Sequence, residues 1–100
     1  MKRILALLAL LALPAAADMV ATNGTGDELR LMDAPCTNSA ILDGIKPEYQ
    51  DQFQRGQATV GKQTHALCWI DTREGYYFVF FENGQSMPFP ITAFVSSPGT

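Results

Sequence analysis

The stretch that decides the fold runs from residue 64 to residue 89 and reads THALCWID-TREG-YYFVFFE-NG-QSMPF. Three of its segments, 64–71, 76–82 and 85–89, are rich in aromatic and other apolar residues. The segments between them contain glycine, asparagine or threonine, which are common in turns. This pattern predicts three antiparallel strands connected as a meander, and Pro88 and Pro90 predict that the third strand lies at an edge of the sheet.

The lengths of the two turns fix the register that we expect. A four-residue loop at 72–75 places Trp69 opposite Phe78 and Cys68 opposite Val79. A two-residue turn at 83–84 then places Phe78 opposite Phe89. In this register the face that carries Cys68 packs into the core. The opposite face is also apolar, and its members, which form the candidate binding face, are Leu67, Trp69, Phe78, Phe80, Met87 and Phe89.

Two interpretations of the candidate binding face remain open. A sheet face in contact with water normally carries polar residues, so an apolar face needs a cover. The cover is either the N-terminal hairpin, through Val20, Leu29 and Leu31, or another protein molecule. Large exposed apolar patches are rare on monomers, which favours the hairpin. Three aliphatic side chains are nevertheless a small cover for four aromatic ones, so we expect a partly exposed face that binds a partner or a second copy.

The rest of the chain supplies further elements. Apolar residues alternate on both sides of Asn23-Gly24, which predicts a hairpin over 18–33. Residues 37–56 change to a helical period and predict two short helices, with Thr37 or Asn38 as the first cap, Pro47 starting the second helix and Gly56 ending it. The expected fold is therefore α+β, a short helical segment packed on an antiparallel β-meander in one domain, 18–95, with a flexible C-terminal tail at 96–100.

Cys36 and Cys68 are the two cysteines of the chain. In an oxidising compartment they have one possible intramolecular pairing. A redox or metal site would instead call for a C-x-x-C spacing or nearby histidines, and the sequence has neither. We therefore expect a structural disulfide.

Residues 1–17 have the layout of a cleavable signal peptide. Lys2 and Arg3 precede the apolar run 4–13, and Ala15-Ala16-Ala17 offers a cleavage site before Asp18. A membrane anchor is the alternative, but it needs about 20 apolar residues. We expect a periplasmic or secreted protein with no membrane span in the mature chain.

The charge of the chain disfavours nucleic acid as a partner. Loss of Lys2 and Arg3 with the signal peptide changes the formal charge from −3 to −5. Binding to phosphates requires clustered basic residues, whereas those of the mature chain are isolated along the sequence. They are Arg30, Lys46, Arg55, Lys62 and Arg73.

No arrangement of residues in the sequence indicates catalysis. His65 is the only histidine, which excludes sites built on two histidines. The register places it near Glu82, where a surface contact is the expected outcome. The serines lack a G-x-S-x-G context and the acidic pairs lie at turns. We therefore expect no catalytic residue, no metal site and no cofactor, and the chain is not expected to be an enzyme.

Several short motifs form the framework of the chain: Pro35-Cys36-Thr37-Asn38, Ile45-Lys46-Pro47-Glu48, Ala66-Leu67-Cys68-Trp69, Phe80-Phe81-Glu82-Asn83-Gly84 and the end from Pro90 to Phe94. These motifs resemble those of a group of small exported proteins of unknown function from Gram-negative bacteria and their phages. The resemblance covers most of the mature chain, implies periplasmic export and a prophage origin, and brings no catalytic residues. Asn83-Gly84-Gln85 stands where the group would have an acidic turn, which argues against an acidic binding loop there.

Two hypotheses about function follow. The first is a non-enzymatic interaction module in the cell envelope, which uses the candidate binding face against another envelope protein or a second copy of itself. The alternative is a small hydrolase, or a hydrolase inhibitor, that acts on envelope polymers. A flat aromatic sheet face would favour the module, and a deep polar cleft with converging carboxylates would favour the enzyme.

Overall fold

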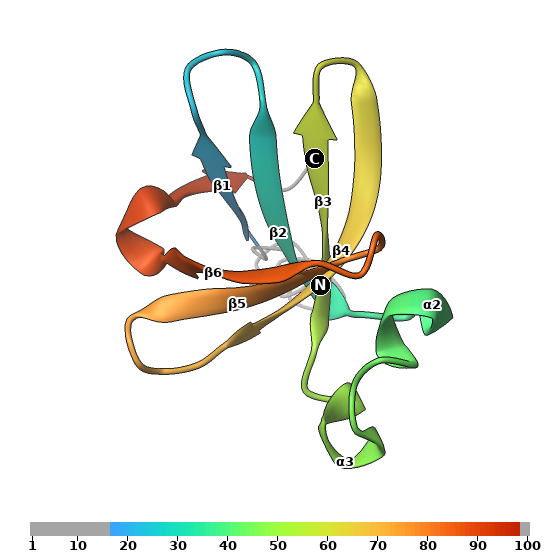
Figure 1. Ribbon diagram of the computed structural model, residues 1–100. Coiled ribbons are helices and arrows are strands. Elements are labelled where there is room, and N and C mark those ends of the chain that lie inside the picture. The colour runs from blue at the N-terminus through green and yellow to red at the C-terminus, as the bar shows by residue number, and fades with distance from the viewer. Residues whose placement is uncertain (1–16, 99–100) are drawn as a thin grey trace, which may run out of the picture.

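Strands dominate the computed structural model, which describes residues 17–98 (Figure 1). They form one antiparallel sheet in the order β6-β5-β4-β3-β2-β1-β7. The strands are β1 (Ala17–Thr22), β2 (Glu28–Pro35), β3 (Gln54–Val60), β4 (Gln63–Asp71), β5 (Tyr76–Phe81), β6 (Ser86–Pro90) and β7 (Val95–Pro98). The helical elements are α2 (Ser39–Leu42), α3 (Pro47–Gln50) and the 3-10 turn η1 (Ile91–Ala93). The predicted signal peptide, apart from Ala17, lies outside the described residues.

The expected α+β class is wrong, because the chain folds as a mostly β protein. The two predicted helices exist but have four residues each. Asn38 caps the first, accepting a hydrogen bond from the main-chain nitrogen of Ile41 at 3.2 Å, and Pro47 starts the second. Helices of this length have little stability of their own. Gly56, expected to end a helix in a left-handed conformation, lies instead inside β3, whose residues alternate between buried and more exposed positions.

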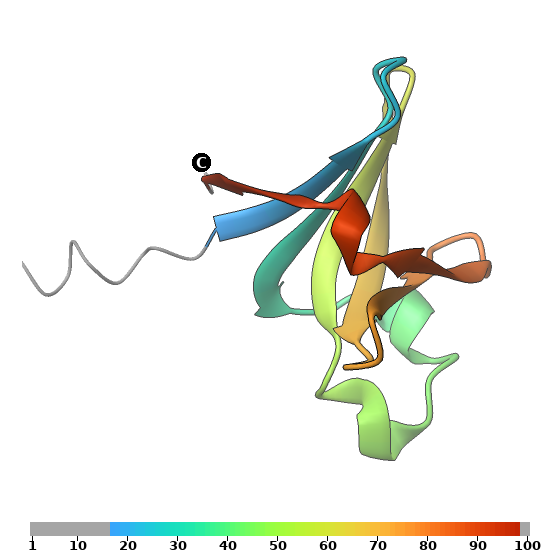
Figure 2. The same cartoon turned by 90° about the vertical axis from the view of Figure 1, so that its left-hand side faces the viewer.

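The sheet curls into a half-barrel because of how its last two strands are connected. β6 and β7 lie at opposite ends of the strand order, yet only residues 91–94 join them. Across a flat seven-stranded sheet these strands would be about 29 Å apart. The connection from Pro90 to Val95 spans at most about 18 Å. The sheet must therefore bend, and Figure 2 shows β5, β6 and η1 crossing the other strands at an angle.

The register of the meander differs by one residue from the expected one. Trp69 pairs with Val79, and Cys68 pairs with Phe80. On the next pair of strands, Tyr77 lies opposite Phe89. A shift of one residue moves a strand's side chains to the other face of the sheet relative to its neighbour. The β5 side chains that were predicted on one face of the sheet therefore lie on the other face, and the reverse.

Both turns of the meander contain three residues, and this causes the shift. In the first, the main-chain nitrogen and the hydroxyl of Thr72 donate to the Tyr76 carbonyl, at 3.3 and 2.7 Å, closing a loop over 73–75. In the second, the Phe81 nitrogen donates to the Gln85 carbonyl at 2.8 Å, closing a loop over 82–84. Gly84 has φ +93°, the left-handed conformation that three-residue hairpin loops require.

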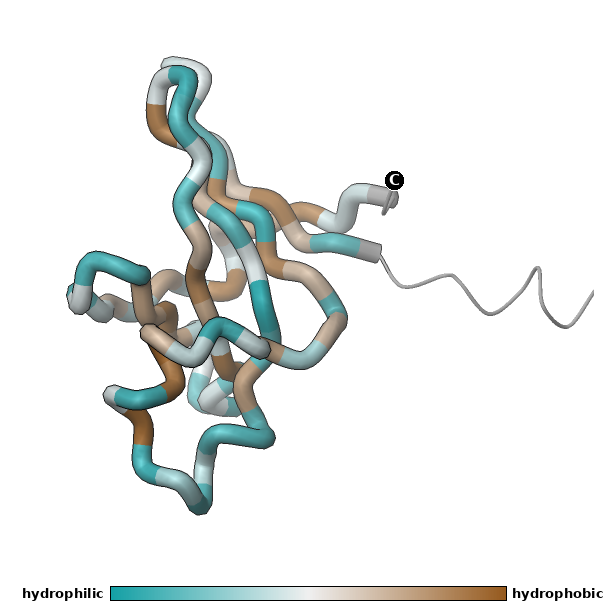
Figure 3. The backbone as a smooth tube through the Cα atoms, turned by 90° about the vertical axis from the view of Figure 1, so that its right-hand side faces the viewer, coloured by the Kyte–Doolittle hydropathy of each residue, from teal (hydrophilic) through white to brown (hydrophobic). Residues whose placement is uncertain are grey.

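Two apolar clusters lie on the two faces of the sheet. The first fills the concave interior, and its buried members are Leu29, Leu31, Ala58, Leu67, Trp69 and Val79. The second lies between the convex face and the helical segment, and its buried members are Cys36, Ile41, Ile45, Phe53 and Cys68. Along the strands, hydrophobic stretches alternate with hydrophilic ones (Figure 3), as expected for strands with a buried side.

Gly56 lies where the interior is most crowded. It pairs with Leu31 on β2 and with Leu67 on β4. A Cβ atom at this position would lie 2.5 Å from the Arg30 carbonyl oxygen and 2.7 Å from Leu67 Cδ1. A glycine inside a strand often marks a close approach or a bend of the sheet. Gly56 thus allows the Leu67 side chain to pack across β3.

β2 contains an irregularity that Trp69 stabilises. The register of β2 with β3 shifts between Leu31 and Pro35. The indole nitrogen of Trp69 donates to the carbonyl oxygens of Met32, at 3.2 Å, and Arg55, at 3.0 Å. Bulges leave main-chain groups without ladder partners, and buried groups of this kind are costly unless another donor reaches them. Trp69 supplies that donor from the interior.

One edge of the sheet, formed by β7, was not expected from the sequence, whereas the other edge, formed by β6, was. Residues 96–98, expected in a flexible tail, belong to β7 and pair with β1, with Ser97 opposite Asp18. Residues 99 and 100 lie outside the described residues. On the other edge, β6 carries Pro88 and Pro90 as predicted for an edge strand, and each proline removes one main-chain donor.

Candidate functional site

Most of the half-barrel interior is filled by its own side chains. Leu31 and Val79 are 0% exposed and Trp69 is 4% exposed. The ring of Tyr77 packs edge-on against Trp69, at a centroid distance of 5.2 Å, and against Phe94, at 5.3 Å. The interior at this level is a packed core and leaves no room for a ligand.

The interior opens near the tips of the hairpins. Two adjoining hollows there have volumes of about 290 and 420 Å³ and share Ala58, Val60 and Phe81. Together they form what we call the mouth groove. Its apolar lining consists of Ala21, Leu29, Ala58, Val60, Phe81, Met87 and Phe89. Val60 is 54% exposed and Met87 is 40% exposed, so the groove presents apolar surface to solvent.

The hairpin tips that border the groove are fixed to each other. The β1–β2 and β3–β4 hairpins rise together at the top of Figure 2. The main-chain nitrogen of Gly61 donates to Asp27 Oδ1 at 3.1 Å, and the Asn23 amide donates to the other oxygen of Asp27 at 3.2 Å. The Asp27 carboxylate therefore links the two tips.

Acidic side chains lie at both ends of the mouth groove. Asp27 lines one hollow and Glu82 lines the other, while neither hollow is lined by a described lysine or arginine. Glu28 also borders the groove, but its carboxylate is 2.9 Å from an Arg30 nitrogen. Arg30 also bonds Asp18 at 2.9 Å, and this hydrogen bond, with Coulomb attraction from both acids, raises the pKa of Arg30 despite partial desolvation. The charge of Glu28 is thus already balanced.

His65 and Glu82 form the contact expected from the sequence. Their Nδ1 and Oε2 atoms are 3.1 Å apart, with the two side chains 42% and 41% exposed. Both residues border the larger hollow of the groove. An exposed pair of this kind adds little to stability and leaves the Glu82 carboxylate accessible at the rim.

The six residues of the candidate binding face do not share one face. Leu67, Trp69 and Phe89 belong to the interior, whereas Phe78 and Phe80 point to the convex side with Cys68. Of the six predicted residues, the mouth groove contains Met87 and Phe89.

The N-terminal hairpin, which the sequence suggested as one possible cover for the candidate binding face, covers part of it. Leu29 and Leu31 pack in the same cluster as Trp69. Val20, which pairs with Arg30, lies on the other face of the sheet. The half-barrel curl, which the sequence did not reveal, brings the hairpin leucines against the meander.

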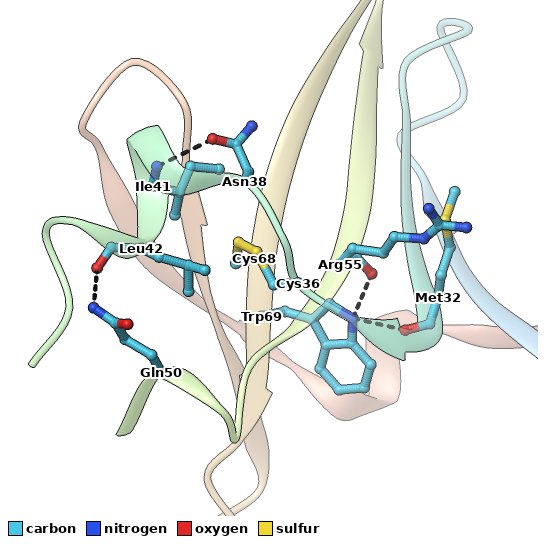
Figure 4. The surroundings of a disulfide bond; sticks show 9 residues. All are labelled: Met32, Cys36, Asn38, Ile41, Leu42, Gln50, Arg55, Cys68 and Trp69. Carbon is cyan, nitrogen blue, oxygen red and sulfur yellow. Dashed lines mark hydrogen bonds between the residues drawn. A yellow bond between two sulfur atoms is a disulfide. The ribbon is translucent and has the colours of Figure 1, made fainter. Parts of the chain in front are cut away.

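The structure confirms the disulfide between Cys36 and Cys68, whose Cα atoms are 5.6 Å apart (Figure 4). The disulfide ties the start of the helical segment to the centre of β4, where Cys68 directly precedes Trp69 in the sequence. Gln50 of α3 donates to the carbonyls of Leu42, at 2.8 Å, and Ile45, at 2.9 Å, which holds the two helices together. These are structural roles for the cysteine pair.

A further hollow, of about 620 Å³, lies beside the disulfide segment and has both polar and apolar residues in its lining. Thr37 and Asn38 line it from the loop, and Arg55, Gln57 and Thr64 line it from β3 and β4. The Oδ1 atom of Asn38 already caps α2. The apolar residues of its lining, Met32, Cys36, Ala66 and Leu67, are buried or partly buried, whereas the mouth groove exposes Val60 and Met87, so we regard the mouth groove as the candidate site.

Sequence reasoning did not single out Val60 or Phe81 as site residues. The alternation of Ala58, Thr59 and Val60 along β3 could have placed Val60 on the interior face. Its position in the groove follows from the half-barrel curl, which depends on a pairing between β1 and β7 that local sequence does not reveal.

Within residues 17–98, no helix is long and apolar enough to cross a membrane. Over the same range, no group of three or more His, Cys, Asp or Glu side chains is placed to hold a metal ion. Comparison of the chain with protein-family models, with curated proteins and with solved structures finds no match.

Proposed function

We propose that the protein is exported to the periplasm or secreted, and acts there as a non-enzymatic interaction module that binds another envelope protein through the mouth groove. The observation that carries this proposal is the exposure of Val60 and Met87 above a groove whose floor is continuous with the core. Exposed apolar surface in a concave setting is typical of binding sites.

Export is supported by two features of different kinds. The charged start, the apolar run 4–13 and the alanines before Asp18 have the layout of a signal peptide. The Cys36–Cys68 disulfide suits an oxidising compartment, since cytosolic proteins rarely keep such bonds.

Export is tested by expressing the full chain in a Gram-negative host and measuring the intact mass of the protein in each cell fraction. We expect a periplasmic or secreted chain that begins at Asp18. A chain that retains Met1 in the membrane or cytosolic fraction would contradict the proposal.

Binding is tested by photo-crosslinking in intact cells. A photoreactive amino acid replaces Val60 or Met87 in the groove, and Tyr49, which is 49% exposed on α3, serves as the matched control. We expect the same discrete crosslinked product from both groove positions and none from position 49. Equal crosslinking at all three positions, or none in the groove, would contradict a binding role for the groove.

A further inference from the structure

The mouth groove has an apolar floor and an acidic residue at each end. From this arrangement we infer that its occupant is an apolar segment of another protein that carries a basic residue on each side. The inference rests on the proposed function, that the groove binds protein, and adds the chemistry of the partner.

The apolar part of the inference follows from the groove lining. Val60 and Met87 stand at its open side, and Phe81 and Phe89 are partly buried against the core below them. Apolar side chains of a partner would displace water from this surface, which is favourable in proportion to the area covered. Apolar anchors are therefore the first requirement.

The basic part follows from the two rim acids. Two hydrogen bonds hold the Asp27 carboxylate in place, and the Glu82 carboxylate is bonded to His65. Neither carboxylate is paired with a described lysine or arginine. Cations at the two ends of a bound segment would meet fixed negative charge, which steers association and adds affinity.

A second copy of the chain is a poorer occupant. Two grooves in contact would place Asp27 and Glu82 of one copy against the same acids of the other, and like charges across an interface are unfavourable.

Strand addition at the neighbouring β6 edge is also disfavoured. The main-chain hydrogen bonds from Phe81 to Gln85 and from Ile91 to Gly75 show that the N–H and C=O groups of the odd-numbered residues of β6 point toward β5. Pro88 and Pro90 therefore occupy outward positions, where they offer no donor.

The test uses the disulfide-bonded mature chain and three synthetic peptides. The peptides share one apolar core of leucine and valine and are flanked on both sides by lysine, serine or glutamate. Fluorescence anisotropy of the labelled peptides gives the affinities at low and high salt. We expect the lysine-flanked peptide to bind about three- to tenfold more tightly than the serine-flanked one, and the glutamate-flanked one to bind most weakly. The lysine advantage should disappear at about 1 M salt, where the Debye length is about 3 Å.

Charge variants of the protein locate the effect. E82Q and D27N should each reduce the ratio of the affinity for the lysine-flanked peptide to that for the serine-flanked peptide. E74Q, which changes an exposed acid in the β4–β5 loop, is the matched control and should leave all affinities unchanged. Thermal unfolding of each variant verifies that it folds.

The outcomes separate the inference from the proposed function. Equal binding of the lysine-flanked and serine-flanked peptides would overturn the inference and leave the groove as a binding site. Failure of the lysine-flanked peptide to bind at about 1 mM would also overturn it. A dimer that forms through the groove would replace the inferred partner by a second copy. Failure of the proposed function shows instead in the cellular crosslinking experiment, which uses no peptide.

Discussion

Replacing Gly56 by alanine should destabilise the protein strongly, because the added methyl group has no space. The new Cβ would lie 2.5 Å from the Arg30 carbonyl oxygen and 2.7 Å from Leu67 Cδ1. The carbonyl oxygen belongs to the neighbouring strand β2, so it moves only if the sheet distorts. Overpacking of this kind costs about 1–3 kcal/mol, which is a large part of the stability of a small domain.

The assay is thermal unfolding by circular dichroism, with urea denaturation as a second measurement. A loss of about 1–3 kcal/mol corresponds to a fall in Tm of roughly 5–25 °C for a domain of this size. Gly44→Ala is the matched control, because its nearest contact would be the Ile41 carbonyl at an ordinary 3.5 Å. We expect that variant to unfold within about 0.5 kcal/mol of the parent chain.

A double variant tests whether Leu67 is part of the clash. Leu67→Ala alone leaves a cavity and costs about 2–5 kcal/mol. Adding Gly56→Ala to it should cost less than adding Gly56→Ala to the parent chain, since one of the two close contacts is gone. A Gly56→Ala variant that unfolds at the same temperature and urea concentration as the parent would refute the packing of Leu67 across β3.

Three further predictions concern the disulfide, the bulge in β2 and the response to alkaline pH. Replacing Cys36 and Cys68 by alanine together should cost about 3–4 kcal/mol for a loop of this length, measured by urea denaturation. Trp69→Phe should cost about 1–3 kcal/mol, since two main-chain carbonyls lose their donor, and the urea midpoint should fall accordingly. Burial, with a smaller Coulomb contribution from Asp71, raises the pKa of Tyr77, so its contribution to stability is fully present below about pH 10 and is lost as pH rises through the raised value. Tyr77→Phe should therefore lose less stability than the parent chain between about pH 9 and pH 12, measured from urea midpoints.

The strands and caps could be predicted because their determinants are local. Asn38 caps α2 and Pro47 starts α3 as expected, and the hairpin around Asn23-Gly24 forms. The pairing of Cys36 with Cys68 followed from their number and from the oxidising compartment that the expected export implies. Each of these features depends on residues close in sequence or on chemistry with one available solution.

The register failed because it depends on turn length, which composition does not determine. The segment 72–75 contributes three residues to its loop, since Thr72 pairs with Tyr76. The loop after Phe81 also has three residues, although Asn83-Gly84 is typical of a two-residue turn. Each difference of one residue moved the side chains of a strand to the other face of the sheet relative to the neighbouring strand. The residues of the candidate binding face are therefore divided between the core and the convex side.

The mouth groove could not be predicted because it depends on contacts between distant residues. It forms where the β1–β2 and β3–β4 hairpins pass beyond the β5–β6 hairpin, and this requires the pairing of β1 with β7. The same long-range pairing turned residues 96–98 from an expected tail into a strand. Local sequence patterns carry no information about which distant strands meet.

The central claim, that the mouth groove is a binding surface rather than an incomplete core, is tested most directly by crosslinking from position 87 in a chain that carries Val60→Asp. Val60 is 54% exposed, so an aspartate there should leave the thermal unfolding temperature nearly unchanged. It would also place a charge at the open side of the groove, which a bound apolar segment would have to desolvate. We predict loss of the crosslinked product with Tm retained. An unchanged crosslinked product, or a steep fall in Tm, would contradict the claim.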